Sequence, residues 1–261
     1  MRKAKNQDRF KEFISIVRRL RKECPWDREQ THESIRHSLI EEAYEVVEAI
    51  DHKDMEELRN ELGDLLIHVA MHAVMAEEEK AFTLGGILKA VSEKLIRRHP
   101  HVFGSAKAAT AREVKANWER LKMQEGRTSM LDGVPKKLPA LLKARRLQEK
   151  ASKVGFDWKN REDVWKKVEE ELREFRAAEE QNDTAGIEEE FGDLLFSLVN
   201  YARFLEIHPE LALSRTSEKF SRRFRRIEKE LAKQKINPAE AGLDLMDRLW
   251  MEGKKKEKRL R

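Results

Sequence analysis

Acidic residues occur in spaced pairs that are suited to binding a metal ion. Glu42 and Glu45 are three residues apart, and Glu61 and Asp64 repeat that spacing further along the chain. Because a helix turns by about 100° per residue, side chains three residues apart lie on the same face. If the two helices pack antiparallel, the four carboxylates converge. Such a group is expected to hold a hard divalent cation, Mg²⁺ with Mn²⁺ as a substitute.

The same acidic pattern occurs a second time, in the residues Glu171, Glu174, Glu190 and Asp193. The first and third members are 19 residues apart in both sets. A solvated acidic helix face would explain one such pair, but it does not explain two pairs that recur at equal spacing. A di-iron site is disfavoured because it would need Glu-x-x-His pairs. The sequence therefore predicts two tandem magnesium sites.

One carboxylate of each set is expected to act as the general base. A group that is not fully used as a metal ligand can take the proton from an attacking water. Glu45 and Glu174 are the candidates, although the residue pattern does not separate a ligand from a base. Both therefore stand as candidate metal ligands and candidate catalytic residues.

Each acidic pair borders an apolar stripe, and these stripes are expected to form the contact between the two helices. The stripes consist of Leu39, Ala43, Val46 and Ile50, then Leu58, Leu62, Leu65 and Val69, then Val168, Leu172 and Phe175, and finally Ile187, Phe191, Leu194 and Leu198. Gly63 and Gly192 lie within the predicted helices, where glycine costs about 1 kcal/mol relative to alanine. A close approach of another group to the backbone would account for both.

The elements that position these residues are predicted to be helices throughout. The periodicity predicts helices at 8–23, 33–51, 53–79, 83–98, 110–124, 138–152, 161–180, 183–206, 209–233 and 238–258, and no convincing strand. Glycine, proline and turn-forming residues collect at 125–139. Together with the internal repeat, this predicts an all-α fold of two tandem helical-bundle domains, 1–124 and 140–261, joined by the linker 125–139.

Composition restricts the class of protein further. Charged residues make up 39% of the chain, the formal net charge is +5, and Cys24 is the single cysteine. A disulfide framework is therefore excluded, and a cytoplasmic location is expected. No apolar run is long enough to span a membrane, and the charged start does not resemble a secretion signal.

The repeated motifs, Glu41-Glu42-x-x-Glu45 with Glu61-x-x-Asp64 and Glu170-Glu171-x-x-Glu174 with Glu190-x-x-Asp193, resemble the MazG family of all-α nucleoside triphosphate (NTP) pyrophosphatases. The strings CPWDREQT, RRHPHVFG and VGFDW are similar to it as well. The resemblance implies Mg²⁺-dependent hydrolysis of NTP to nucleoside monophosphate (NMP) and pyrophosphate. It also implies broad use of ribo- and deoxynucleotides, a role in clearing nucleotides or in stress responses, and a homodimer whose protomers complete each other's bundles.

By the same resemblance, cations and one aromatic residue bind the substrate. The phosphate-binding candidates are Lys94, Arg98, Lys167, Lys219 and Arg223, and Trp250 is expected to stack on the base or cap the pocket. The first half has Ser38 at the position of Lys167, so the second half is expected to be the stronger site. Trp26 and Trp158 are expected to pack rather than to contact ligand.

Two other functions are consistent with parts of the sequence. A basic, helical nucleic-acid-binding protein would explain the net charge, but the acidic clusters would repel phosphate in the absence of metal. A helical regulator with little catalysis is the other alternative, and the intact acidic sets in both halves argue against it.

Overall fold

The computed structural model describes residues 2–106, 110, 113–114 and 129–259. The chain forms two compact units, Met1–Val114 and Lys115–Arg261. The division falls ahead of the predicted linker 125–139, and the described part of that linker consists of turns and bends. The predicted helix 110–124 lies almost entirely outside the described residues.

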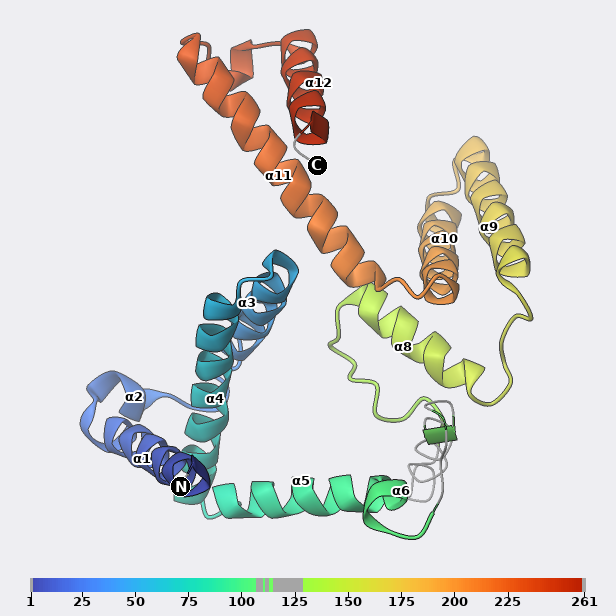
Figure 1. Ribbon diagram of the computed structural model, residues 1–261. Helices are drawn as coiled ribbons and strands as arrows, with labels where there is room; N and C mark the ends of the chain where they lie inside the picture. Colours follow the sequence, from blue (N-terminus) through green and yellow to red (C-terminus); the bar gives the residue numbers. More distant parts are fainter. Residues whose placement is uncertain (1, 107–109, 111–112, 115–128, 260–261) are drawn as a thin grey trace. The chain divides into compact units, whose positions relative to one another are not determined.

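The first unit begins with a long helix that packs against the C-terminal half of a central helix, and with a short helix that packs against the first one. Helices α1 (Arg2–Glu23) and α2 (Pro25–Glu29) precede α3 (Ser38–His52) and α4 (Met55–Glu78), and α5 (Leu84–Arg98) and α6 (Pro100–Phe103) follow. The core of this unit joins α1 to the second half of α4 through Ile14, Val17, Ile35, Ala70, Met71, Val74 and Met75. The first half of α4 is thereby left to pair with α3 (Figure 1).

The turn between α3 and α4 is tight because its residues suit it. Lys53 adopts a left-handed conformation (φ 58°) and ends α3. The Asp54 carboxylate then accepts hydrogen bonds from the backbone N–H groups of Glu56 and Glu57 at 3.1 and 3.0 Å. Such a cap satisfies donors that would otherwise be unpaired at the start of α4. The two helices consequently run antiparallel, with Glu42 and Glu45 facing Glu61.

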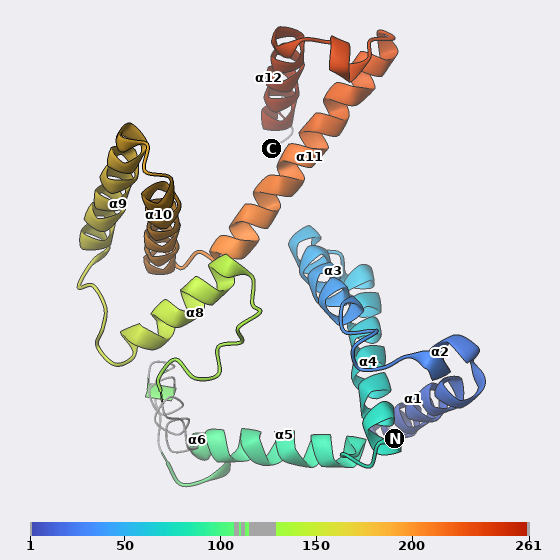
Figure 2. The same ribbon diagram turned by 180° about the vertical axis from the view of Figure 1, so that it is seen from behind.

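The second unit repeats this hairpin with α9 (Arg161–Gln181) and α10 (Thr184–Phe204). Asn182 takes the left-handed position of Lys53 (φ 54°), and the Asn160 side chain caps the start of α9. Helix α8 (Ala140–Ser152) packs against α10. Helix α11 (Pro209–Lys233) packs against α8 and against α12 (Leu243–Arg259), which follows the short 3₁₀ turn η1 (Pro238–Glu240). Figure 2 shows the α9–α10 and α3–α4 hairpins from behind.

The predicted all-α class is confirmed, and none of the described residues belongs to a strand. The predicted helix 33–51 begins later, at Ser38, because Thr31 and Ser34 bond each other's backbone N–H groups through their hydroxyls and form a turn. The short helices α2 and α6 were not predicted, and each begins with proline in its first turn. No helix in the described ranges is both long and apolar enough to cross a membrane.

The prediction about the apolar stripes is wrong for several of their residues. Leu62 and Phe191 are 51% and 49% exposed, whereas Glu61 and Glu171 are buried at 8% and 6% exposed. The helices of each hairpin therefore meet partly along the acidic side, and part of the stripe faces outward. The reason is geometric, because small buried residues such as Ala49 and Ala178 allow the helices to approach closely beside the carboxylates. In the second hairpin the stripe residues Phe175 and Phe191 still contact each other across α9 and α10, with ring centres 5.7 Å apart.

Candidate active site

Three carboxylates converge in the first unit. Glu42 and Glu45 of α3 and Glu61 of α4 each place one oxygen within 4.8 Å of the others. Asp64, one turn beyond Glu61, lies outside this tight group. Its charge nevertheless acts on the group, because burial, Glu45 and Asp64 together raise the pKa of Glu42. Three of the four predicted ligands are thus brought together, with the fourth beside them.

Burial and the neighbouring carboxylates disfavour the charged form of Glu61 at this site. Burial, followed by the neighbouring Glu45 carboxylate, raises the pKa of Glu61 to about 7. A carboxyl with such a pKa is about half protonated near neutral pH and gives up its proton when a cation binds. The oxygen-only, anionic donor set fits a hard divalent cation of the Mg²⁺ type.

The second unit builds the same cluster from Glu171 and Glu174 of α9 and Glu190 of α10, again with oxygens within 4.8 Å of one another. Burial raises the pKa of Glu190, and the charges of Glu174, Glu171 and Asp193 add to that effect. Asp193 is exposed and Asp64 is partly buried, and each lies outside the tight group of three in its unit. The repeat predicted from spacing is therefore present in three dimensions.

Glu45 and Glu174 differ from their neighbours in exposure. Both are exposed, whereas Glu61 and Glu171 are buried. A carboxylate at the open side of the cluster can reach a water molecule and pass its proton to solvent. This placement is compatible with the predicted role of general base for these two residues.

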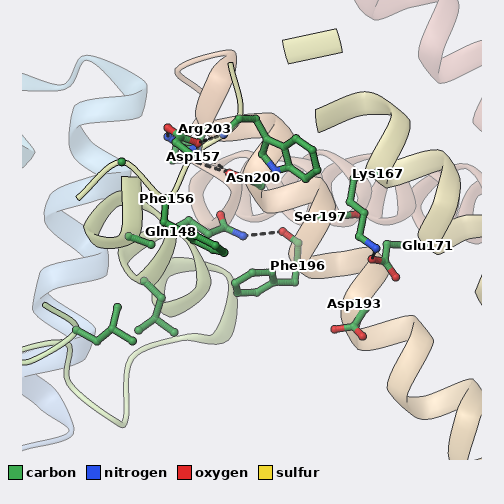
Figure 3. A pocket seen from close by; sticks show the side chains of 15 residues that line it. Gln148, Phe156, Asp157, Lys167, Glu171, Asp193, Phe196, Ser197, Asn200 and Arg203 are labelled. Atoms are coloured by element: carbon green, nitrogen blue, oxygen red, sulfur yellow. Dashed lines mark hydrogen bonds and ion pairs between the residues drawn. The ribbon is translucent and has the colours of Figure 1, made fainter. Parts of the chain in front are cut away.

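A cavity of about 680 Å³ opens beside the carboxylates of the second unit; we call it the second-unit cavity. Its walls are largely apolar and include Leu147, Ala151, Phe156, Trp158 and Phe196. Its polar lining residues are Gln148, Asp157, Lys167, Glu171, Asp193, Ser197, Asn200 and Arg203. Figure 3 shows Lys167, Glu171 and Asp193 at one end of the cavity and the group of Asp157, Asn200 and Arg203 at the other.

The loop between α8 and α9, which lines this cavity, is fixed by specific contacts. The Arg203 guanidinium pairs with Asp157 through both carboxylate oxygens and donates to the Asn200 side-chain oxygen at 3.0 Å. Gly155 has a φ of +87°, a conformation that side-chain-bearing residues rarely adopt. Trp158 is 44% exposed and lines the cavity. Its position differs from the packing role predicted for it.

Gln148 presents a fixed acceptor at the same cavity. Its side-chain N–H donates to the backbone carbonyl of Phe196 at 2.8 Å, so the amide nitrogen must face that carbonyl (Figure 3). The amide oxygen is then buried without a partner among the described residues. Sequence reasoning missed Gln148, Asn200 and Arg203. The spacing of Glu190, Asp193, Ser197 and Asn200, at steps of three, four and three, was the available signal for Asn200.

The first unit has two smaller hollows at its cluster, of about 400 and 320 Å³. Glu45 and Glu61 line the first of them. Glu42, Asp64, Trp26 and His68 line the second, so Trp26 also differs from its predicted packing role. His68 occupies the helix position that Ser197 holds in the second unit, and its Nε2 lies 4.0 Å from Glu42. The two sites therefore have equivalent carboxylates, but the pockets beside these carboxylates differ.

The structure does not bring most of the predicted phosphate-binding cations to the clusters within one chain. Lys94 and Arg98 lie on α5, and neither lines the pockets described above. Lys219 and Arg223 lie on α11, outside the lining of the second-unit cavity. Lys167 is the exception, because it lines that cavity directly.

Trp250 is likewise separate from the second-unit cavity. Arg223 bonds Glu257 of α12 at 2.7 and 2.9 Å, and its guanidinium lies 5.4 Å from the centre of the Trp250 ring. Phe220 contacts the same ring. The predicted base-stacking residue is therefore grouped with one predicted phosphate-binding residue, Arg223, on the α11–α12 pair.

Helical hairpins that oppose Glu-x-x-Glu to Glu-x-x-Asp around a carboxylate cluster, twice in one chain, define the class of all-α nucleotide pyrophosphohydrolases. The chain belongs to the MazG family, because the MazG nucleotide pyrophosphohydrolase domain matches residues 30–103 and 159–227. Each matched segment contains one of the two hairpins.

Related proteins support this assignment over nearly the whole chain. The chain is 44% identical over 250 residues to the nucleoside triphosphate pyrophosphohydrolase/pyrophosphatase MazG of Thermotoga maritima, covering 94% of this chain and 95% of that protein. It is 43% identical to the nucleoside triphosphate pyrophosphohydrolase of Escherichia coli K12, covering 94% and 97%. It is also 48% identical to the uncharacterized protein YabN of Bacillus subtilis, covering 96% of this chain and 52% of YabN.

Proposed function

We propose that the protein hydrolyses nucleoside triphosphates to nucleoside monophosphates and pyrophosphate. Membership of the MazG family and the two relatives named for this activity support the assignment. The observation that carries it in the structure is the convergence of Glu171, Glu174 and Glu190 beside a cavity of about 680 Å³. This size lies within the usual range of small-ligand pockets.

The proposed cofactor is Mg²⁺, with Mn²⁺ able to replace it. The residues that would hold it are Glu42, Glu45, Glu61 and Asp64 in the first unit and Glu171, Glu174, Glu190 and Asp193 in the second. A bound divalent cation supplies charge neutralisation at the phosphates and acidifies a coordinated water. In the chain itself, Glu45 and Glu174 would accept the proton as water attacks the α-phosphorus and pyrophosphate departs.

The second-unit cavity is the proposed site for the nucleoside. Trp158, Phe156 and Phe196 offer apolar and aromatic surface, on which any base can stack. This supports broad use of ribo- and deoxynucleotides, and with it a cellular role in clearing nucleotides or in stress.

The single cysteine, Cys24, is free, which supports a reducing, cytoplasmic location.

The activity is tested by incubating the full chain with each ribo- and deoxynucleoside triphosphate, once with Mg²⁺ and once with excess EDTA. We expect NMP and pyrophosphate in equal amounts, formed only with Mg²⁺. Release of nucleoside diphosphate and phosphate would contradict attack at the α-phosphorus. Absence of turnover with every nucleotide would refute the function.

We further propose that the protein acts as a homodimer in which each hairpin packs against the second chain. The exposed stripe residues leave apolar surface that a soluble monomer rarely shows; examples are Leu62, Val69, Phe191 and Leu198. A Cβ at Gly192 would meet no described atom within 4 Å, so no described part of the same chain explains this helical glycine. A partner helix would, and a partner could also bring cations of α11 to the carboxylates.

The dimer predicts a specific response to charge on the outward stripe. Val69 and Leu198 hold equivalent positions in the two repeats and are 45% and 40% exposed. We expect the double variant Val69→Lys/Leu198→Lys to be monomeric, because burying two ammonium groups at an interface is unfavourable. Light scattering after gel filtration measures the mass. The control Asn60→Lys/Glu189→Lys, on the same helices, should remain dimeric, and an unmodified chain with the mass of a monomer would contradict the proposal.

A further inference from the structure

One lysine lies at the carboxylate cluster of the second unit. The Lys167 ammonium lies 2.7 Å from Glu171 Oε1 and 2.5 Å from Glu170 Oε1. Glu171 is buried, with 7% of its side chain exposed, and is one of the three carboxylates that converge there. Figure 3 shows the lysine reaching Glu171 from the preceding turn of α9, with Asp193 beside them. The ammonium therefore neutralises part of the charge that a metal ion would neutralise.

The first unit has no such lysine at this position. The residue that corresponds to Lys167 is Ser38, which precedes Glu42 by one helical turn as Lys167 precedes Glu171. Among the described residues, Glu42 instead pairs with His68, whose Nε2 is 4.0 Å away. The carboxylates are thus matched in the two units. Of the two equivalent positions 38 and 167, only position 167 carries a lysine.

The Lys167 side chain is also placed where it can exchange one anionic partner for another. It lines the second-unit cavity, and its side chain is 35% exposed, on a flexible four-carbon stem. A divalent cation on Glu171 would lie next to the ammonium, and the two positive charges would repel each other. The polyphosphate of a nucleotide in the cavity offers the ammonium a new anionic partner.

We propose that Lys167 holds Glu171 in the free enzyme and transfers to the phosphates of the nucleotide, so that metal and nucleotide bind the second unit as a coupled pair. The first unit, with Ser38, takes its metal without this coupling. This inference rests on the proposed function for the identity of the anionic ligand. Coupling between two ligands commonly amounts to about 5- to 150-fold in affinity, and it acts equally on both.

The test measures metal binding rather than turnover. The Mn²⁺ affinity of the full chain is measured by electron paramagnetic resonance. The background substitutions Glu45→Gln/Glu61→Gln disable the first site. Each measurement is made in the absence and in the presence of α,β-methylene ATP. We expect Lys167→Ser to bind Mn²⁺ about tenfold more tightly without the analogue. With the analogue the gain should vanish, because the parent lysine has then left Glu171. Lys167→Arg should keep the coupling of the parent.

The first unit supplies a reciprocal variant. With Glu174→Gln/Glu190→Gln disabling the second site, Ser38→Lys should weaken Mn²⁺ binding without the analogue and gain affinity when the analogue is added. Circular dichroism melting confirms that each variant is folded. An unchanged Mn²⁺ affinity in Lys167→Ser, or an equal gain with and without the analogue, would overturn the inference. If either result is found while the protein still releases pyrophosphate, the coupling through Lys167 is refuted and the proposed function stands.

Discussion

Glu190→Gln is expected to lower Mg²⁺-dependent pyrophosphate release by about a hundredfold, whereas Glu61→Gln should lower it only a few-fold. Both substitutions remove one carboxylate from a cluster of three. The second unit should dominate because its cluster adjoins the larger cavity and includes Lys167 beside it. Pyrophosphate release at saturating NTP measures the effect.

The control for this comparison is Glu188→Gln, an exposed carboxylate of α10 outside the cluster. It removes the same charge from the same helix and should leave the rate within about twofold of the parent, as a surface change outside the reacting groups does. A large loss with Glu61→Gln but not with Glu190→Gln would assign the main activity to the first unit. Unchanged activity in Asp193→Ala would contradict the preference for the second unit as well.

Trp158→Ala is expected to lower kcat/KM by about tenfold, mainly through a higher KM. Stacking of a base on an aromatic side chain contributes about 1–3 kcal/mol, and the indole lines the second-unit cavity. Because the ring lies in the cavity wall and the carboxylates are untouched, Mg²⁺ dependence should persist. Steady-state kinetics with ATP and dCTP measures both parameters.

The chain offers a matched control in Trp165, which is 43% exposed against 44% for Trp158. Trp165 packs on Tyr201, with ring centres 4.9 Å apart, and does not line the cavity. Trp165→Ala should therefore leave KM unchanged. Equal effects of the two substitutions on KM would show that the loss reflects the packing of α9 and α10 rather than contact with the base.

The carboxylate clusters could be predicted from sequence because their geometry is local. Glu171, Glu174 and Glu190 lie on two consecutive helices, so the helical period and one short turn determine how they meet. The turn itself contains Asn182 in a left-handed conformation, which asparagine tolerates better than most residues. Nothing distant in the chain is needed to form the cluster.

The cavity and the buried faces could not be predicted in the same way. Gln148, Asp157 and Arg203 come from α8, a loop and α10, and they meet only when α8 packs on the hairpin. The apolar stripes were assigned to the helix contact because apolar residues are usually buried. Which face is buried depends on every surface available to a helix: Phe191 contacts Phe175 of α9, with ring centres 5.7 Å apart, yet 49% of it stays exposed while Glu171 is buried.

The hairpin construction has a consequence for how the protein folds. All carboxylates of a cluster come from one stretch of chain with a single tight turn, as between α9 and α10. Contacts between residues close in sequence require little loop closure and form early, whereas those that build the cavity join distant segments and form later. Each cluster is therefore able to assemble before the pocket beside it exists. A divalent ion that binds this early structure would stabilise it by mass action and serve as a folding aid as well as a cofactor.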